Sequence, residues 1–150
     1  MKKLNRKGFT LIELLAVIVI LAIVLVVTIP SVLRSISGAR EQSLENAANS
    51  VADWLTRQSE LSELAGTGVT TDTVDTNYTS LVGASGWATA TEKSKGVTLS
   101  DALLKAAGFG GGTTDATGKA WKSGNKICVE LTATSTGRLQ NAGSKTSAGC

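Results

Sequence analysis

The sequence has no histidine, one proline, two cysteines and only 4% aromatic residues among its 150 positions. Without histidine the chain lacks the commonest general base and the commonest neutral metal ligand, and it can form no Ser-His or Cys-His nucleophile pair. These absences argue against most hydrolase chemistry. The scarcity of large aromatic rings also predicts a modest hydrophobic core.

Charge is unevenly distributed along the chain. The formal net charge is +3, but Lys2, Lys3, Arg6 and Lys7 place four basic side chains in the first eight residues, and the remainder is slightly acidic. The basic isoelectric point therefore gives no reason to expect a nucleic-acid-binding protein. Residues 39–110 carry more acidic than basic side chains and residues 111–150 more basic than acidic ones, a polarity that could pair neighbouring subunits or hold DNA or another surface. A solvated lysine face is the simpler explanation, because no aromatic side chains interleave with these lysines.

A long apolar segment follows the basic leader. Between Phe9 and Ile29 only Thr10, Glu13 and Thr28 are polar, and about 21 helical residues extend roughly 31 Å, enough to cross a bilayer core. No small-x-small cleavage site ends the run, which argues against an ordinary secretory signal peptide. The positive-inside rule keeps the N-terminus in the cytoplasm and exports the chain beyond residue 30.

Glu13 is a carboxylate one turn inside this apolar segment. An unpaired charge is costly in lipid, so we expect the carboxylate either to reach the interface or to have a partner. Cleavage between Gly8 and Phe9 would create such a partner, because the new α-amino group of Phe9 is a cation. Within one helix the two groups are at i and i+4; between helices, the pair would fix the register of neighbouring subunits.

The octapeptide KGFTLIEL, residues 7–14, resembles the class III leader of type IV pilins and of the pseudopilins of type II secretion and competence systems. The resemblance covers residues 2–30. It implies that a prepilin peptidase cuts after Gly8 and N-methylates Phe9, and that Glu13 sets subunit register. Pro30 lies where helices of that family usually have a proline, and its missing N–H predicts a kink there.

The remaining sequence predicts an α+β fold like that of pilins, with a long N-terminal helix packed on a small antiparallel sheet. We divide the chain into a cleaved leader (1–8), a transmembrane or filament-core helix (9–30) and a globular head (31–150) whose amphipathic helix extends to about residue 64. One stripe of that helix is apolar, which favours packing on the sheet. It comprises Leu44, Ala47, Ala48, Val51 and Leu55, with Leu61 and Leu64 continuing it.

Shorter elements come after this helix. We expect residues 66–96 to form a connection with at most one short strand, Ser100–Ala107 a helix with Ser100 as N-cap and Gly108 after its end, and residues 110–112 a flexible break. Ala120–Lys122 and Lys126–Thr134 are predicted to be strands joined by a turn at residues 123–125, with a third strand at residues 138–140. On the second strand Ile127, Val129 and Leu131 are expected to face inward, opposite Lys126, Cys128 and Glu130.

Cys128 and Cys150 both lie on the exported side. An even number of cysteines there favours a disulfide that closes the C-terminal loop, worth about 3 kcal/mol, and many pilins close a C-terminal loop in this way. Two free thiols are the alternative. After residue 110 the acidic residues are Asp115 and Glu130 alone, too few for a calcium loop. We expect no metal, no cofactor and no catalytic residue.

The resemblance implies a structural protein rather than an enzyme: a subunit of a type IV pilus-like filament, linked to cell adhesion and twitching motility. Its implied partners are other copies of the chain, prepilin peptidase, the assembly platform protein, the motor ATPase and the cytoplasmic membrane. Before assembly the subunit would be located in that membrane, and after assembly it would be part of a pilus on the cell surface. The alternatives are a pseudopilin of a secretion or DNA-uptake system and a membrane-anchored adhesion or binding domain that never polymerises. A secreted enzyme is the remotest interpretation.

Overall fold

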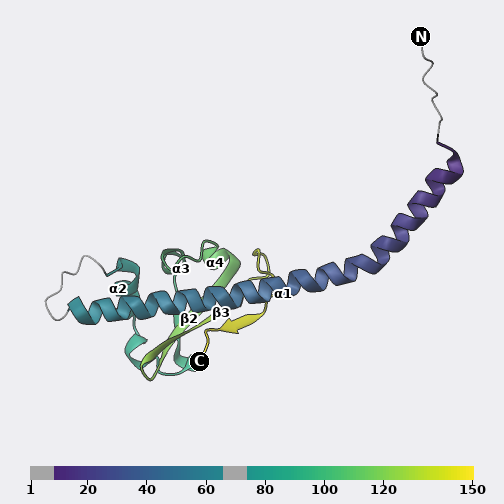
Figure 1. Cartoon of the computed structure of the whole chain (residues 1–150). Helices are drawn as coiled ribbons and strands as arrows, with labels where there is room; N and C mark the ends of the chain where they lie inside the picture. The colour runs from purple at the N-terminus through teal and green to yellow at the C-terminus, as the bar shows by residue number, and fades with distance from the viewer. Residues whose placement is uncertain (1–8, 66–73) are drawn as a thin grey trace, which may run out of the picture. The chain divides into compact units, whose positions relative to one another are not determined.

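A computed structural model describes residues 9–65 and 74–150. The chain divides into two compact units, one ending at Ile36 and the other, here called the head, comprising Ser37–Cys150. The helices are α1 (Leu11–Ala65), α2 (Thr76–Val82), α3 (Asp101–Ala106) and α4 (Gly112–Asp115), and the strands are β1 (Val97–Leu99), β2 (Ala116–Ser123), β3 (Lys126–Ala133) and β4 (Ser144–Thr146) (Figure 1). Short 3-10 turns occupy Trp87–Thr89 and Lys93–Lys95.

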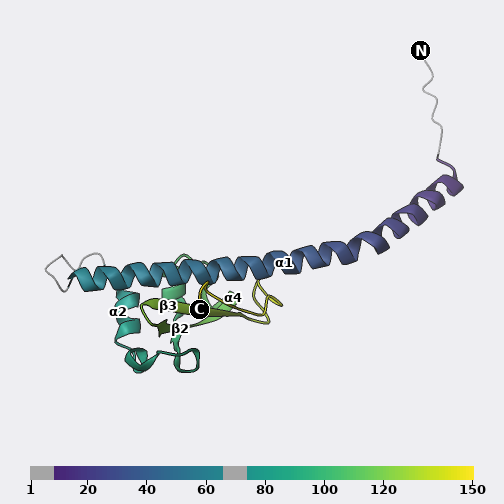
Figure 2. The ribbon, with the colours of Figure 1, turned by 60° about the horizontal axis from the view of Figure 1, so that its bottom comes forward.

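The four strands form one antiparallel sheet in the order β1-β2-β3-β4. Within the head, α1 lies along one face of this sheet (Figure 2). The predicted α+β fold is therefore confirmed. The predicted hairpin is also confirmed: Ser123 pairs with Lys126, leaving a two-residue turn. Its first strand begins at Ala116, earlier than expected, and its second ends at Ala133.

The amphipathic stripe of α1 supplies one side of the head core, as its spacing predicts. Leu44, Ala48, Val51 and Leu55 are fully buried. They share one core with side chains of the sheet and of α3, namely Leu99, Leu103, Leu104, Val129 and Leu131. The stripe does not continue to the end of the helix, because Leu64 is exposed.

A second, smaller apolar cluster lies on the other face of β3. The expected alternation is confirmed, because Ile127, Val129 and Leu131 lie in the main core and Cys128 does not. On the opposite face of the strand, however, Cys128 is completely buried with Trp121 and Ala90. Trp121 and Cys128 are cross-strand partners, so their side chains lie on the same face of the sheet and share this cluster. Both faces of the sheet are thus partly apolar at this point, which simple alternation does not predict.

Helix α3 begins and ends as its sequence predicts. The Ser100 hydroxyl accepts a hydrogen bond from the Leu103 N–H at 3.2 Å. At the other end Gly108 has φ +90°, and the Phe109 N–H donates to the Leu104 carbonyl at 2.9 Å. This is a Schellman ending, which needs a left-handed residue at Gly108. Helix α3 buries Leu103 and Leu104 as expected.

Two predictions about connections are wrong. Within the expected loop of residues 66–96, of which 66–73 lie outside the described residues, Thr76–Val82 forms helix α2, capped by the Asp75 carboxylate on the Asn77 N–H. The predicted strand at residues 138–140 is a turn, and the edge strand beside β3 is β4 instead.

Residues 110–112 are not a flexible break. Gly112 begins α4, and a Cβ placed on Gly111 would collide with the Asp115 carboxylate. The glycines allow a close approach of the chain to Asp115 rather than giving freedom of movement.

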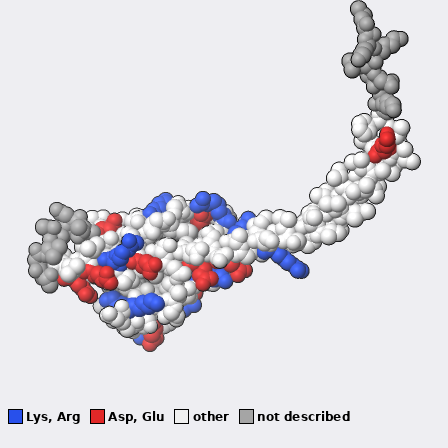
Figure 3. Space-filling model, in the orientation of Figure 1, with Lys and Arg blue, Asp and Glu red and all other residues white. Residues whose placement is uncertain are grey.

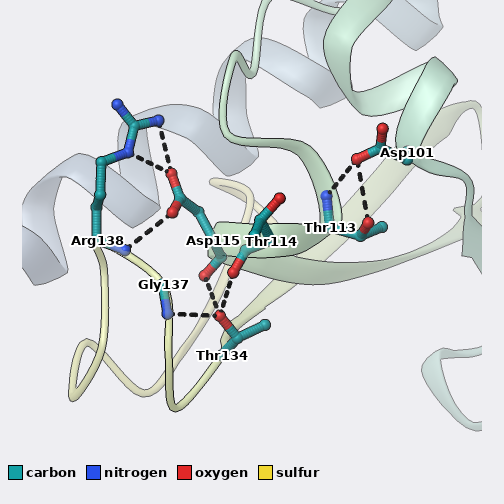
Figure 4. Close-up of polar contacts among 7 residues, drawn as sticks. All are labelled: Asp101, Thr113, Thr114, Asp115, Thr134, Gly137 and Arg138. Carbon is teal, nitrogen blue, oxygen red and sulfur yellow. Dashed lines mark hydrogen bonds and ion pairs between the residues drawn. The ribbon is translucent and has the colours of Figure 1, made fainter.

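Asp115 ties the segment after β3 to the start of β2 (Figure 4). Its side chain is only 7% exposed, and it accepts hydrogen bonds from the Arg138 main-chain N–H at 2.9 Å and from the Arg138 Nε at 2.8 Å, with Nη2 at 2.7 Å. Thr134 adds main-chain and hydroxyl hydrogen bonds to the Asp115 carbonyl. The turn that contains Arg138 is therefore fixed by a buried carboxylate.

This pair makes the stability of the head depend on pH. Hydrogen bonds from the Arg138 side chain and main chain lower the pKa of Asp115, against the opposing effect of burial. The stabilisation is therefore present above the unfolded pKa of about 3.9 and is lost as pH falls through the lower folded pKa. We expect Asp115→Asn to reduce the unfolding free energy by about 1.5–3 kcal/mol at pH 7 and by less at an acid pH below about 3.9, measured by urea denaturation.

A matched variant separates the ion pair from other effects at this position. Arg138→Gln leaves Asp115 in place without its cation, so it should cost a similar amount at pH 7, and the double variant should cost less than the sum of the two. Equal losses from Asp115→Asn at both pH values would contradict the assignment.

Candidate functional site

The N-terminal half of α1 is apolar on every side. The large hydrophobic side chains from Leu11 to Ile36 are exposed in the isolated chain, and among the described residues α1 is the single helix long and apolar enough to cross a membrane. A helix with no polar face is stable only when lipid or other apolar helices surround it. This segment therefore needs an apolar environment outside its own chain.

Thr10 and Glu13 form a reciprocal cap at the start of this helix. Glu13 Oε2 accepts hydrogen bonds from the Thr10 N–H at 2.9 Å and from the Thr10 hydroxyl at 2.8 Å, while the Glu13 N–H approaches the Thr10 Oγ1 at 3.4 Å. This is a capping box, with Thr10 as N-cap and Glu13 as the third helical residue. Glu13 is the only charged residue between Phe9 and Leu33.

The role predicted for Glu13, as a partner for an amino group, did not include this cap. The signal was present in the sequence, because Thr10-Leu11-Ile12-Glu13 matches the Thr-x-x-Glu pattern of a capping box. The structure is of the uncleaved chain, in which Phe9 has a main-chain amide rather than an α-amino group. Phe9 precedes the helix and is 88% exposed, whereas Gly8 lies outside the described residues.

Pro30 lies inside α1, as expected from its position. Because proline has no N–H, the carbonyl four residues earlier, on Val26, receives no helical hydrogen bond from it. Just before the proline, the Thr28 hydroxyl donates to the Val24 carbonyl at 2.9 Å. A bend at Pro30 stays a prediction.

The predicted disulfide is present. Cys128 and Cys150 are joined with their Cα atoms 5.8 Å apart, and the described part of the chain has no free cysteine. The bridge fastens the C-terminus to the middle of β3, where Cys128 lies in the second apolar cluster.

The same C-terminal tail also contacts α1. The Ala148 N–H donates to the Asn49 side-chain oxygen at 2.7 Å, and Lys145 pairs with Glu41 at 3.0 Å. Lys126 donates to the Ala148 carbonyl at 2.7 Å. The tail thus joins the sheet to the helix, and the disulfide anchors its end.

Metal-ligating side chains do not gather in the described part of the chain. Within residues 9–65 and 74–150, no set of three His, Cys, Asp or Glu side chains comes together. In the same residues every buried side-chain nitrogen or oxygen has a hydrogen-bond partner. The features that stand out for function are therefore the N-terminal helix with its cap and the disulfide-closed head.

Comparison with known families finds a match to the N-terminal segment. The model of the prokaryotic N-terminal methylation motif matches residues 3–29, which include Lys3, Arg6 and Lys7 of the leader together with Gly8, Phe9 and Glu13. No curated protein and no solved structure matches the sequence. The match supports a class III prepilin leader of the type IV pilin kind, attached to a helix that fits a membrane anchor.

Proposed function

We propose that this chain is a structural subunit of a type IV pilus-like filament, cleaved after Gly8, N-methylated at Phe9 by prepilin peptidase, and polymerised through residues 9–30. The observation that carries the proposal is the methylation motif on a helix that is apolar on every side. The motif supports cleavage and methylation by prepilin peptidase. The apolar helix supports polymerisation, because lipid or other apolar helices must cover its surface.

Assembly would replace lipid around this helix by other copies of it. Lipid tails are as apolar as the side chains, so the gain comes from helix packing and from polar contacts inside the bundle. Glu13 provides the polar contact. Its hydrogen bonds to Thr10 use Oε2, and a carboxylate has acceptor sites on both oxygens. One Glu13 can therefore cap its own helix and still accept the Phe9 amino group of a neighbour.

Before assembly the subunit would stay in the cytoplasmic membrane, with residues 1–8 in the cytoplasm until cleavage and residues 31–150 outside. Its role is structural, and its partners would be prepilin peptidase, the platform protein, the motor ATPase and other copies of the chain. The Cys128–Cys150 bridge supports a pilus subunit over a secretion or competence pseudopilin.

Intact-mass measurement and N-terminal sequencing of material sheared from cells test this proposal. We expect a chain that starts at Phe9, carries one extra methyl group and gains two hydrogens on reduction. A chain that retains Met1–Gly8 in a host with active prepilin peptidase would contradict it and would leave a membrane-anchored domain. A start beyond Pro30 would indicate an ordinary signal peptide.

A further inference from the structure

Two arginines are held in place on one side of the head. Arg138 is fixed by Asp115, yet its side chain is 77% exposed. Arg40 Nη1 donates to the carbonyl of Gln140, two residues further along the same turn, at 3.3 Å. These arginines, here called the arginine edge, lie on the side of α1 that bears α4. A guanidinium fixed by part of its donors presents the rest outward, an arrangement suited to a carboxylate.

The opposite flank of α1 is acidic. Glu45, Asp53 and Glu60 are all exposed, and at 100° per residue they lie within about 80° of one another around the helix. The ion pairs of the described residues do not include them. The nearest opposite charge along the helix is Arg57, three positions before Glu60 and four after Asp53. We call these three carboxylates the acidic strip. Figure 3 shows acidic side chains along the helix, with basic ones beside them, and further basic side chains along the edge formed by α3 and α4.

The two surfaces face different ways around one helix. Arg40 is on the side of the Gln140 turn, whereas Glu41 and Asn49 mark the other side, where the C-terminal tail attaches. Glu45 lies on that tail side by helical position. Because the acidic strip and the arginine edge lie on different sides of one head, they cannot contact each other within that molecule. They can contact each other between two copies.

We infer that the acidic strip of one head contacts the arginine edge of the next head, side by side in the filament. The contact is heterologous, so it repeats from copy to copy without closing a two-fold dimer. This inference rests on the proposed function, because parallel subunits around a common helical core present different sides to each other. A second copy is favoured over a nucleic acid because it uses both surfaces, whereas phosphates would use only the arginine edge.

Charge reversal in the full-length chain, expressed in its host, tests the contact. We compare filaments of the wild type, of Glu45→Lys/Glu60→Lys, and of that variant combined with Arg40→Glu. The lysine variant should give about two- to tenfold less sheared filament, since a few exposed pairs each change association by a small factor. Adding Arg40→Glu should restore most of the yield. Glu45→Gln/Glu60→Gln, which removes charge without reversing it, should give an intermediate yield.

Salt provides a second readout. Raising NaCl from about 50 mM to about 0.5 M should weaken wild-type filaments and strengthen those of the lysine variant, because screening reduces attraction and repulsion alike. Normal processing and an unchanged melting temperature in each variant would exclude a folding defect.

The outcomes separate the two proposals. Wild-type filaments with equal yields from the lysine variant at both salt concentrations would overturn the contact and leave the proposed function intact. DNA binding that Arg40→Glu abolishes, with filament yields unaffected in all variants, would overturn it in favour of a nucleic acid. A wild-type chain that is never cleaved and forms no filament would overturn the proposed function and the contact with it.

Discussion

Replacing Glu13 by alanine is expected to abolish filaments while leaving cleavage after Gly8 and the fold of the head unchanged. The head core begins at Leu44, so residue 13 makes no contribution to it. A membrane helix without Glu13 is more apolar and should insert at least as well. What disappears is the one acidic group that can receive the Phe9 amino group of a neighbour. The measurement is the amount of sheared filament, with the mass of the cellular chain as control for processing.

Two further variants separate the charge of Glu13 from its capping role. Glutamine can replace glutamate in a capping box but cannot pair with a cation, so Glu13→Gln should cap the helix and still fail to assemble. Thr10→Ala removes the cap, worth about 0.5–2 kcal/mol of helix stability, and keeps the carboxylate. It should assemble with a modest loss. Filaments from Glu13→Gln together with none from Thr10→Ala would show that the cap, rather than the charge pair, drives assembly.

The elements that could be predicted from the sequence are those that local residues define. The stripe of α1 follows from helical spacing, and the β2–β3 hairpin from two β-rich runs around Gly124. The two ends of helix α3 could be predicted because the Ser100 side chain caps its start and Gly108 adopts the left-handed conformation after its end. In each case the decisive interactions are close in sequence.

The elements that could not be predicted depend on distant partners. Strands β1 and β4 have three residues each and are defined by their pairing with β2 and β3. Arg138 was predicted to lie in a strand, but it lies in a turn. Its main-chain N–H donates a hydrogen bond to the carboxylate of Asp115, 23 residues away in the sequence. Cys128 lies on the predicted face of β3, but its burial was not predicted because it depends on Trp121 across the strand pair.

The candidate site divides in the same way. The leader, Glu13 and the cysteines could be selected from residue type and position, and the disulfide is confirmed. The Thr10–Glu13 cap has a sequence pattern of its own, Thr-x-x-Glu, but it was not predicted because the pattern lies at the start of a long apolar run. The arginine edge and the acidic strip could not be foreseen as opposite surfaces, because only the fold shows which side of α1 carries the tail.

Removal of the disulfide is expected to have the largest effect on the stability of the head. Closing the chain between Cys128 and Cys150 is worth about 3 kcal/mol by the loop-entropy estimate, which corresponds to roughly 10 °C in melting temperature for a domain of this size. The bridge also anchors the tail whose contacts with Asn49 and Glu41 join the sheet to α1. We therefore expect Cys150→Ser to lose tail and helix contacts together, as measured by circular dichroism during thermal unfolding.

Reductant distinguishes the bridge from the loss of a buried sulfur. Because Cys128 stays in place in Cys150→Ser, its packing against Trp121 and Ala90 is retained, and only the cross-link is missing. Reduction should lower the melting temperature of the wild type toward that of Cys150→Ser and leave the variant unchanged. Asn49→Ala, which removes one tail contact and keeps the bridge, should cost about 1 kcal/mol. A wild-type melting temperature that does not respond to complete reduction would mean that the tail contacts alone hold the C-terminus.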